Sequence, residues 1–568
     1  MTTRTAVRAL KATALLGAAV LLATAMTDTP EVFAGDHSGG LAQFQQQKID
    51  WQECEVPPVE EGMPKEWIEE WEAVWKSMQC GWMTVPKDYE RPSGDKLKVR
   101  LTRTPASNPG KRQGVLFLNP GGPGVQGAAM PGRHRNTPPA EAYDLIGMDP
   151  RGTSGPDRLR CDLPPGEAPS HTRPTDAQIA EKMAYAAAEE KGCERAGRGL
   201  RPYITTANTA RDMDIARAVL GERKISYLGY SYGTYLAAVY GSLFPNRLGR
   251  SVLDSSMHPD WSYYKASWKQ SVGFRRNVDA WASWVAERNE TYRLGSSAAD
   301  VLAATDELGL KLEENPLDSG TGAPVDRSEL DRIMGYNSTD RGKWNVLAEL
   351  VGHFREQVRS SGRVSRDASE AMRLLASRND EISQGDGVFS AIVCERDWPS
   401  DPKVYERKMR QFRQRYPYGN GATEAGPSPC TFRSYTPLEQ PVDVRRRSYP
   451  TGLVVQNDHD PATVHEGGRA MARRLGHRLV SVRDAGGHGV YGTNTCVDQK
   501  VNDYLLTGRL PARNSWCEGT PRPDVPADGS RVDQGQGSAS RGSLTSQVRD
   551  ILKQDTRPLA PTWTTGRR

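Results

Sequence analysis

The sequence predicts an α/β fold in which a helical cap is inserted into a mostly parallel central sheet. Short apolar runs typical of buried strands alternate with helical patterns early in the chain, at residues 96–103, 114–119, 143–148, 225–229 and 251–254. Between about residues 261 and 440 the pattern becomes helical, with no clear buried strand. Strand patterns return at residues 452–456 and 477–482, so the cap interrupts a single sheet.

Length and composition agree with a globular protein. The chain has 568 residues, of which 37% are hydrophobic and 26% charged, with 13 Trp and 20 Tyr. It can therefore bury a large core. The net charge is only +5, and no basic run is interleaved with aromatic residues, so we expect no nucleic-acid partner. Charge does not indicate the oligomeric state.

The N-terminus has the layout of a secretory signal peptide. Three basic residues within the first eleven precede an apolar stretch at residues 12–26. Cleavage after Ala25 and cleavage after Ala34 both place small residues correctly, so both stay open. The apolar stretch is short for a membrane span, and no later segment offers about 20 apolar residues. We expect a secreted, extracellular protein without a membrane span.

The eight cysteines favour disulfides, because their number is even and the chain is expected to be exported. Eight cysteines allow roughly 100 pairings. Proximity in sequence favours four local pairs, namely Cys54–Cys80, Cys161–Cys193, Cys394–Cys430 and Cys496–Cys517. No Cys-x-x-Cys occurs and the histidines do not cluster, so no metal site is expected.

Residues 229–233 read Gly-Tyr-Ser-Tyr-Gly and match the Gly-x-Ser-x-Gly nucleophile elbow. The glycines permit a strand-to-helix turn so tight that the serine side chain stands exposed. The bare pentapeptide is an ordinary turn in many proteins, but here it lies between an apolar strand and a predicted helix. The sequence therefore predicts the α/β-hydrolase fold and a serine hydrolase with Ser231 as nucleophile.

A serine hydroxyl needs a base to remove its proton, and an acid must orient that base. His488 follows the last predicted strand in a glycine-rich loop and is the candidate base. The candidate acids are Asp458 and Asp460, after the first strand beyond the cap, and spacing does not separate them. Asp254, at the end of an earlier strand, is a third candidate, but its favoured role is to pin a loop.

Residues 119–124 read Asn-Pro-Gly-Gly-Pro-Gly and directly follow a predicted strand. Glycine runs are usually turns, but next to a nucleophile elbow this one predicts an oxyanion loop. Backbone N–H groups suit that role because they need not reorganise as charge develops on the substrate carbonyl. The predicted donors are the N–H groups of Gly122 and Tyr232.

Together with three further motifs, these residues resemble the secreted bacterial tripeptidyl aminopeptidases, relatives of prolyl iminopeptidase. The further motifs are Gly-Met-Asp-Pro-Arg-Gly at 147–152, Ala-Arg-Asp-Met-Asp at 210–214 and Asp-Pro-Ala-Thr at 460–463. The resemblance spans roughly residues 54–517. It implies a triad of Ser231, Asp460 and His488, and so decides for Asp460 among the acids.

The resemblance implies a serine exopeptidase that acts on peptides with a free amino terminus and releases tripeptides without a cofactor. The chain departs from the family in the cap, where residues 394–397 read Cys-Glu-Arg-Asp instead of Cys-x-Asp. An ammonium group pairs with a carboxylate, so Glu395 and Asp397 are the candidates for amine recognition. An esterase or amidase acting on small molecules is the alternative, because the triad does not fix the acyl group.

The predicted domains follow from these assignments. We expect a signal peptide at residues 1–34, the hydrolase core at 35–260 and 441–517, the cap at 261–440, and a disordered tail at 518–568. The tail is poor in periodic apolar residues, apart from one short helical pattern near residues 544–553.

Overall fold

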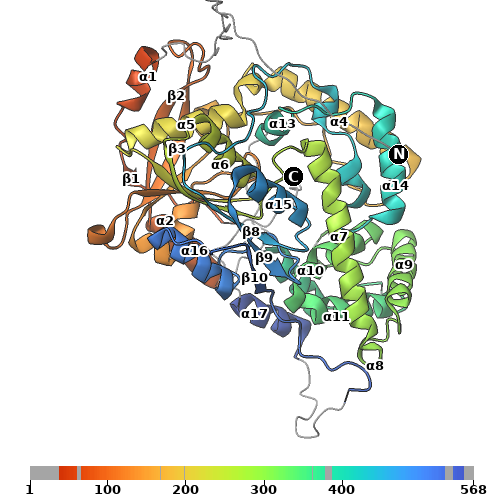
Figure 1. Cartoon of the computed structure of the whole chain (residues 1–568). Helices are drawn as coiled ribbons and strands as arrows, with labels where there is room; N and C mark the ends of the chain where they lie inside the picture. Colours follow the sequence, from red (N-terminus) through yellow and green to blue (C-terminus); the bar gives the residue numbers. More distant parts are fainter. Residues whose placement is uncertain are drawn as a thin grey trace, which may run out of the picture.

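The structure of the chain is a computed structural model, and it describes residues 38–59, 65–166, 168–197, 199–320, 322–360, 362–377, 387–530 and 542–554. The predicted signal peptide and both of its cleavage sites lie outside the described residues. Within the described ranges, no helix combines the length and apolar character needed to cross a bilayer. Figure 1 shows the strands gathered on one side and the helices α7 to α11 on the other.

The described strands form one sheet in the order β1-β2-β3-β5-β4-β6-β7-β8-β9-β10. The first three strands pair antiparallel, β3 is antiparallel to β5, and every pair from β5 onward along the sheet is parallel. Their bounds are β1 Gln52–Glu53, β2 Gln79–Pro86, β3 Lys96–Thr104, β4 Val115–Asn119, β5 Asp144–Met148, β6 Ile225–Tyr230, β7 Leu248–Asp254, β8 Leu453–Asn457, β9 Arg478–Arg483 and β10 Ser515–Glu518.

Helices cover both faces of the sheet. Along β4, Val115 and Phe117 pack into one core cluster while Leu116 and Leu118 pack into another, as expected for a strand buried on both faces. The first cluster receives apolar residues from α5, α6 and α15, and the second from α16. The bounds are α1 Ser38–Gln45, α2 Lys65–Lys76, α3 Met130–Arg133, α4 Asp176–Ala196, α5 Thr206–Val219, α6 Tyr232–Leu243, α15 His465–Leu475 and α16 Thr495–Thr507.

The segment between β7 and β8 contains helices and a core of its own. Its helices are α7 Tyr263–Ala286, α8 Asn289–Tyr292, α9 Ala298–Glu314, α10 Arg327–Ser338, α11 Trp344–Gln357, α12 Arg366–Ser377, α13 Val388–Val393 and α14 Pro402–Arg415. The apolar face of α11 is buried, since Trp344, Leu347, Val351 and Phe354 are inaccessible. In contrast, α13 packs into the sheet-side cluster through Val388 and Ile392.

Parts of the tail contact the cap, which differs from the expectation of disorder. The carbonyl of Val525 accepts from Arg288 Nε at 2.7 Å, and Asp528 N–H donates to the Glu287 carbonyl at 2.8 Å. The helix α17, Leu544–Gln554, buries Val548 completely in the cap core. The helical pattern expected near residues 544–553 corresponds to α17. Its contact with the cap was not expected, because an amphipathic helix needs few apolar residues to dock.

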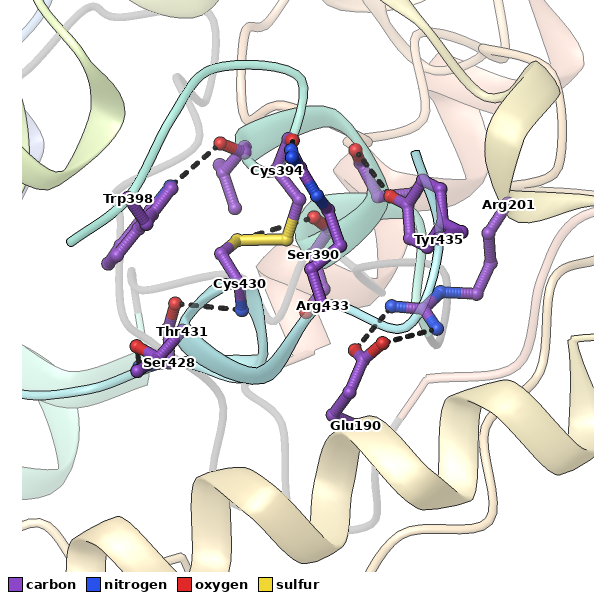
Figure 2. Close-up of a disulfide and its surroundings, with 12 residues drawn as sticks. Glu190, Arg201, Ser390, Cys394, Trp398, Ser428, Cys430, Thr431, Arg433 and Tyr435 are labelled. Carbon is purple, nitrogen blue, oxygen red and sulfur yellow. Dashed lines mark hydrogen bonds and ion pairs between the residues drawn. A yellow bond between two sulfur atoms is a disulfide. The ribbon is translucent and has the colours of Figure 1, made fainter. Parts of the chain in front are cut away.

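All four expected cysteine pairs are disulfides in the structure, and they are Cys54–Cys80, Cys161–Cys193, Cys394–Cys430 and Cys496–Cys517. The third of them joins the C-terminal end of α13 to the short 3-10 helix Pro429–Phe432 (Figure 2).

Candidate active site

The three proposed triad residues come from neighbouring strands of the sheet. Ser231 directly follows β6, Asp460 follows β8 by three residues, and His488 follows β9 by five. The strands β6, β7, β8 and β9 are consecutive and parallel. Their carboxyl ends therefore meet at one edge of the sheet, which is where α/β proteins bind ligands.

Ser231 occupies a strained backbone position at the start of α6. Its φ of 55° and ψ of −123° are unusual for a residue with a Cβ atom, and its N–H donates to the carbonyl of Asp254 at 3.0 Å. The flanking glycines have no room for a side chain. A Cβ on Gly229 would lie 2.4 Å from the Tyr227 ring, and one on Gly233 would lie 2.5 Å from Asn119 Oδ1. The local packing thus requires the elbow glycines.

Asp460 and His488 are joined directly. His488 Nδ1 lies 2.9 Å from Asp460 Oδ2 and 3.1 Å from Oδ1. A carboxylate only accepts hydrogen bonds, so Nδ1 carries the hydrogen and Nε2 is the basic atom of the neutral ring. Thr463 also contacts the carboxylate, since its N–H donates to Oδ1 at 3.0 Å and its hydroxyl oxygen lies 3.0 Å from Oδ2. Asp460 is 1% exposed, so solvent does not compete for these bonds.

The other two aspartates brace the loops around this pair. Asp458 accepts from the N–H groups of Asp484 and Ala485, at 3.0 and 3.1 Å. Asp254 accepts from the N–H groups of Val490 and Tyr491, at 3.1 and 2.7 Å, and so holds the loop that carries His488. Burial raises the pKa of Asp254 to about 6. This loop-pinning contact is the role that the sequence favoured for Asp254.

The glycine-rich loop at residues 121–124 lies beside the elbow. The last residue of β4, Asn119, pairs with Gly229 of β6, and its Oδ1 accepts from Gly121 N–H at 2.9 Å. Gly122 has a φ of +113°, where a Cβ would lie 2.8 Å from two backbone nitrogens. Among the described residues, the N–H groups of Gly122 and Tyr232 have no acceptor within the chain, as an oxyanion site requires.

The two amine-binding candidates lie in different surroundings. Glu395 Oε1 accepts from the N–H and, at 3.0 Å, the hydroxyl of Thr206 at the start of α5. The same hydroxyl accepts from Tyr232 OH at 2.9 Å, so two hydrogen bonds connect Glu395 to the residue after Ser231. Glu395 lines a small pocket with Thr206 and Tyr235. Asp397 is exposed, and the described pocket does not include it.

The chain around Cys394, the residue before Glu395, is held by several contacts, and Figure 2 shows the surroundings of Cys394. Cys394 is fixed by its disulfide, and its carbonyl accepts from Arg433. The preceding turn is fixed as well, because Trp398 Nε1 donates to the carbonyl of Val393 at 3.0 Å and Tyr435 OH donates to that of Ala391 at 3.2 Å. This bracing holds the backbone of Glu395 rigidly against α5.

The motifs at residues 147–152 and 210–214 meet in a buried ion pair. Arg151, from the 147–152 motif, binds Asp212, from the 210–214 motif, with Nε and Nη2 each donating to one carboxylate oxygen. Both side chains are inaccessible to solvent. Tyr89 OH also donates to Asp212, at 2.7 Å. These motifs therefore stabilise the fold behind the site, whereas their role was not deducible from their spacing.

Sequence reasoning missed several residues that shape the site. Gln456 Nε2 donates to Asp460 at 3.2 Å, and its side-chain oxygen accepts from Ser256 N–H at 2.7 Å. Thr206, at the start of α5, was not among the expected site residues, although a capping threonine followed by a second threonine offers a hydroxyl as well as N–H groups. The described residues contain no group of three or more His, Cys, Asp or Glu side chains placed to hold a metal ion.

The sheet, the elbow and the Asp–His pair define a serine hydrolase of the α/β-hydrolase class. A family model described as "alpha/beta hydrolase fold" matches residues 114–321, and one described as "TAP-like protein" matches residues 416–517. The chain is 35% identical to the tripeptidyl aminopeptidase of Streptomyces lividans over 500 residues, which cover 84% of this chain and 88% of that protein. It belongs to the tripeptidyl aminopeptidase family and is a serine peptidase.

Two more distant relatives have other names. The serine protease Hip1 of Mycobacterium tuberculosis (strain ATCC 25618 / H37Rv) is 29% identical over 460 residues, or 77% of this chain and 87% of that protein. Carboxylesterase B of Mycobacterium tuberculosis (strain CDC 1551 / Oshkosh) is 29% identical over 469 residues, or 78% and 86%. Peptidases and a carboxylesterase therefore occur among relatives of similar identity.

Proposed function

We propose that the protein is exported and releases tripeptides from the free amino terminus of peptides. The relative of highest quoted identity bears the name tripeptidyl aminopeptidase, and four disulfides suit an oxidising compartment. The observation that carries the proposal is the carboxyl of Glu395, which lies in a pocket two hydrogen bonds away from Tyr232. A peptide ammonium bound there would hold its chain next to Ser231.

In the proposed reaction, Ser231 Oγ attacks the scissile carbonyl while His488 Nε2 takes its proton. The N–H groups of Gly122 and Tyr232 stabilise the oxyanion that forms. The His488 imidazolium, stabilised by Asp460, then gives its proton to the departing amine, so the C–N bond breaks and an acyl-enzyme remains. Water, deprotonated by the same histidine, hydrolyses that ester and frees the N-terminal fragment.

The test uses matched peptides with free and acetylated N-termini, incubated with the purified protein and followed by mass spectrometry. We expect tripeptide release from the free-amine peptides alone, and none from the Ser231→Ala variant. Glu395→Gln should raise KM for free-amine peptides about tenfold or more, since it removes one charge-assisted pair. Asp397→Asn is the matched control and should leave KM unchanged.

Other results would redirect the proposal. Equal cleavage of acetylated peptides would exclude amine recognition, and release of dipeptides would correct the fragment length. The carboxylesterase relative makes hydrolysis of small esters the second candidate function. Hydrolysis of simple esters with no cleavage of any peptide would replace the peptidase proposal with that one. N-terminal sequencing of protein recovered from the medium would test export and separate cleavage after Ala25 from cleavage after Ala34.

A further inference from the structure

His134 lies between two segments of the candidate active site, although it belongs to none of the motifs above. It follows α3, the helix that comes after the glycine-rich oxyanion loop, and it is only 2% exposed. Its ring contacts Tyr230, the residue before Ser231. It also faces Tyr491, three residues beyond His488. One imidazole therefore contacts the residue before the nucleophile and a residue of the loop that carries the base.

The direction of the hydrogen bonds at His134 follows from its neighbours. Nδ1 lies 3.0 Å from the carbonyl of Met130, which can only accept, so Nδ1 carries the hydrogen. Burial lowers the pKa of His134 to about 4, so the ring is neutral at neutral pH and Nε2 is an acceptor. Tyr230 OH, 3.2 Å away, must then be the donor. Burial also raises the pKa of Tyr230, which keeps that hydroxyl protonated.

A second contact joins His134 to the loop of the base. The rings of His134 and Tyr491 are stacked, with centroids 6.4 Å apart and planes 17° apart. Tyr491 N–H is bound by the Asp254 carboxyl at 2.7 Å, and the Asp254 carbonyl accepts from Ser231 N–H at 3.0 Å. His134 on one side and Asp254 on the other therefore connect the elbow to the histidine loop.

We propose that His134 is a positioning residue for acyl transfer. Through its contacts with Tyr230 and Tyr491, it fixes the position of the nucleophile elbow relative to the loop that carries His488. The inference rests on the proposed function, because it needs Ser231 as the nucleophile. A displacement of about 1 Å between reacting groups can lower a rate on the order of a hundredfold, so small shifts of the elbow are visible in kcat. A purely structural hydrogen bond would change stability alone.

The experiment compares four single variants, and the double variant that combines Tyr230→Phe with His134→Leu, with the unaltered full chain. Tyr230→Phe removes only the hydroxyl, His134→Leu removes both ring nitrogens, and His134→Gln restores an acceptor for Tyr230. Tyr143→Phe is the matched control, because Tyr143 OH is also buried and donates to the carbonyl of Leu505 at 2.6 Å. Tyr143 directly precedes β5, so it lies at the amino ends of the parallel strands and away from the candidate site. The readouts are kcat and KM for a free-amine peptide, the burst rate with p-nitrophenyl acetate, and the melting temperature.

We expect a three- to tenfold loss of kcat and of the burst rate in Tyr230→Phe, and a larger loss in His134→Leu, with KM unchanged. His134→Gln should recover part of the loss, and the double variant should be no worse than His134→Leu. A lower melting temperature with normal kcat in the Tyr230 and His134 variants would overturn this inference and leave the proposed function standing. An equal loss of kcat in Tyr143→Phe would have the same meaning. Absence of any acyl-enzyme at Ser231 in the unaltered protein would overturn the proposed function itself.

Discussion

At the scale of single residues, the three aspartates near the site differ in what they bind. Asp460 binds His488 directly, whereas Asp458 binds backbone N–H groups of the loop before it. Asp460→Asn should therefore lower kcat about 10³- to 10⁴-fold, because an amide can donate to Nδ1 and favour the wrong tautomer. Steady-state kinetics with a free-amine peptide measure this loss.

Asp458→Asn is the matched control for that prediction. It weakens two backbone hydrogen bonds, so the melting temperature should fall while kcat at a low assay temperature stays within a fewfold of normal. If Asp458→Asn were as inactive as Asp460→Asn, Asp458 would have to be reassigned as the acid and the proposed triad would be wrong.

Glu395 gives a prediction for pH dependence. Burial raises the pKa of Glu395 from 4.5 to about 8, so in the empty pocket the carboxyl is neutral at lower pH. The ionised form that pairs with an ammonium becomes available as pH rises toward 8, while a peptide ammonium loses its charge above about 8. For free-amine peptides, kcat/KM should thus rise from pH 6 to about 8 and fall beyond it.

The measurement is the ratio of kcat/KM between the unaltered protein and Glu395→Gln at each pH. Titrations of all other protein groups cancel in this ratio. The titration of the peptide ammonium does not cancel, because the uncharged amide of the variant gains nothing from the ammonium charge. We expect that ratio to peak near pH 8. A ratio that is flat from pH 6 to 9 would mean that Glu395 does not bind the amine.

At the scale of elements, the elbow depends on how closely β6, α6 and β4 approach. Gly233 lies in α6, and an added Cβ would meet Asn119 Oδ1 at 2.5 Å. Gly233→Ala should therefore lower the free energy of unfolding by about 1–3 kcal/mol through overpacking and also lower kcat. Gly352, in α11, has open space around it, so Gly352→Ala should be stabilising by roughly 0.5–1 kcal/mol. Urea denaturation of both variants measures the difference, and equal effects would contradict the packing argument.

The central strands that the sequence predicted were recognisable because both of their faces are buried. The strands β4, β6 and β8 are buried on both faces, so each is a continuous apolar run flanked by turns, and the expected bounds differ from those observed by a residue or two. The strands β2 and β10 were not predicted. β2 leaves Trp82 41% exposed and β10 leaves Trp516 48% exposed, so neither shows the uniform apolar pattern that buried strands have.

Residues of the candidate site could be proposed from the sequence only where a local turn or loop requires particular residue types at fixed positions. Ser231 could be chosen because the elbow needs glycines at fixed positions, and His488 because a glycine-rich loop follows a strand. The choice between Asp458 and Asp460 depends on which carboxyl faces His488, a tertiary contact that spacing does not carry. The contacts of His134 and Thr206 join segments that are tens to hundreds of residues apart, so no local pattern could indicate them.

At the scale of the whole molecule, the described parts of the tail contribute apolar residues to the cap core. α17 inserts Val548 between α11 and α12, about 200 residues earlier in the chain, and Gln547 binds Asn345 and Glu349 of α11. The apolar residues of α17 are too few to form a domain alone. The described tail segments 518–530 and 542–554 therefore pack against the cap.

The four disulfides lead to a prediction for the protein as a whole. They close loops with sequence separations of 26, 32, 36 and 21 residues. In the loop-entropy model each contributes about 3–4 kcal/mol, and the four together match or exceed the roughly 5–15 kcal/mol of net stability that a folded protein has. Full reduction should therefore unfold the protein near 37 °C and abolish peptidase activity.

Thermal melting of the reduced protein measures this effect, with thiol titration to verify eight free cysteines. Reoxidation should restore activity if the loss comes from unfolding. An unchanged melting temperature with eight titrated thiols would mean that packing alone maintains the fold, and the protein would then have no need of the oxidising compartment that export provides.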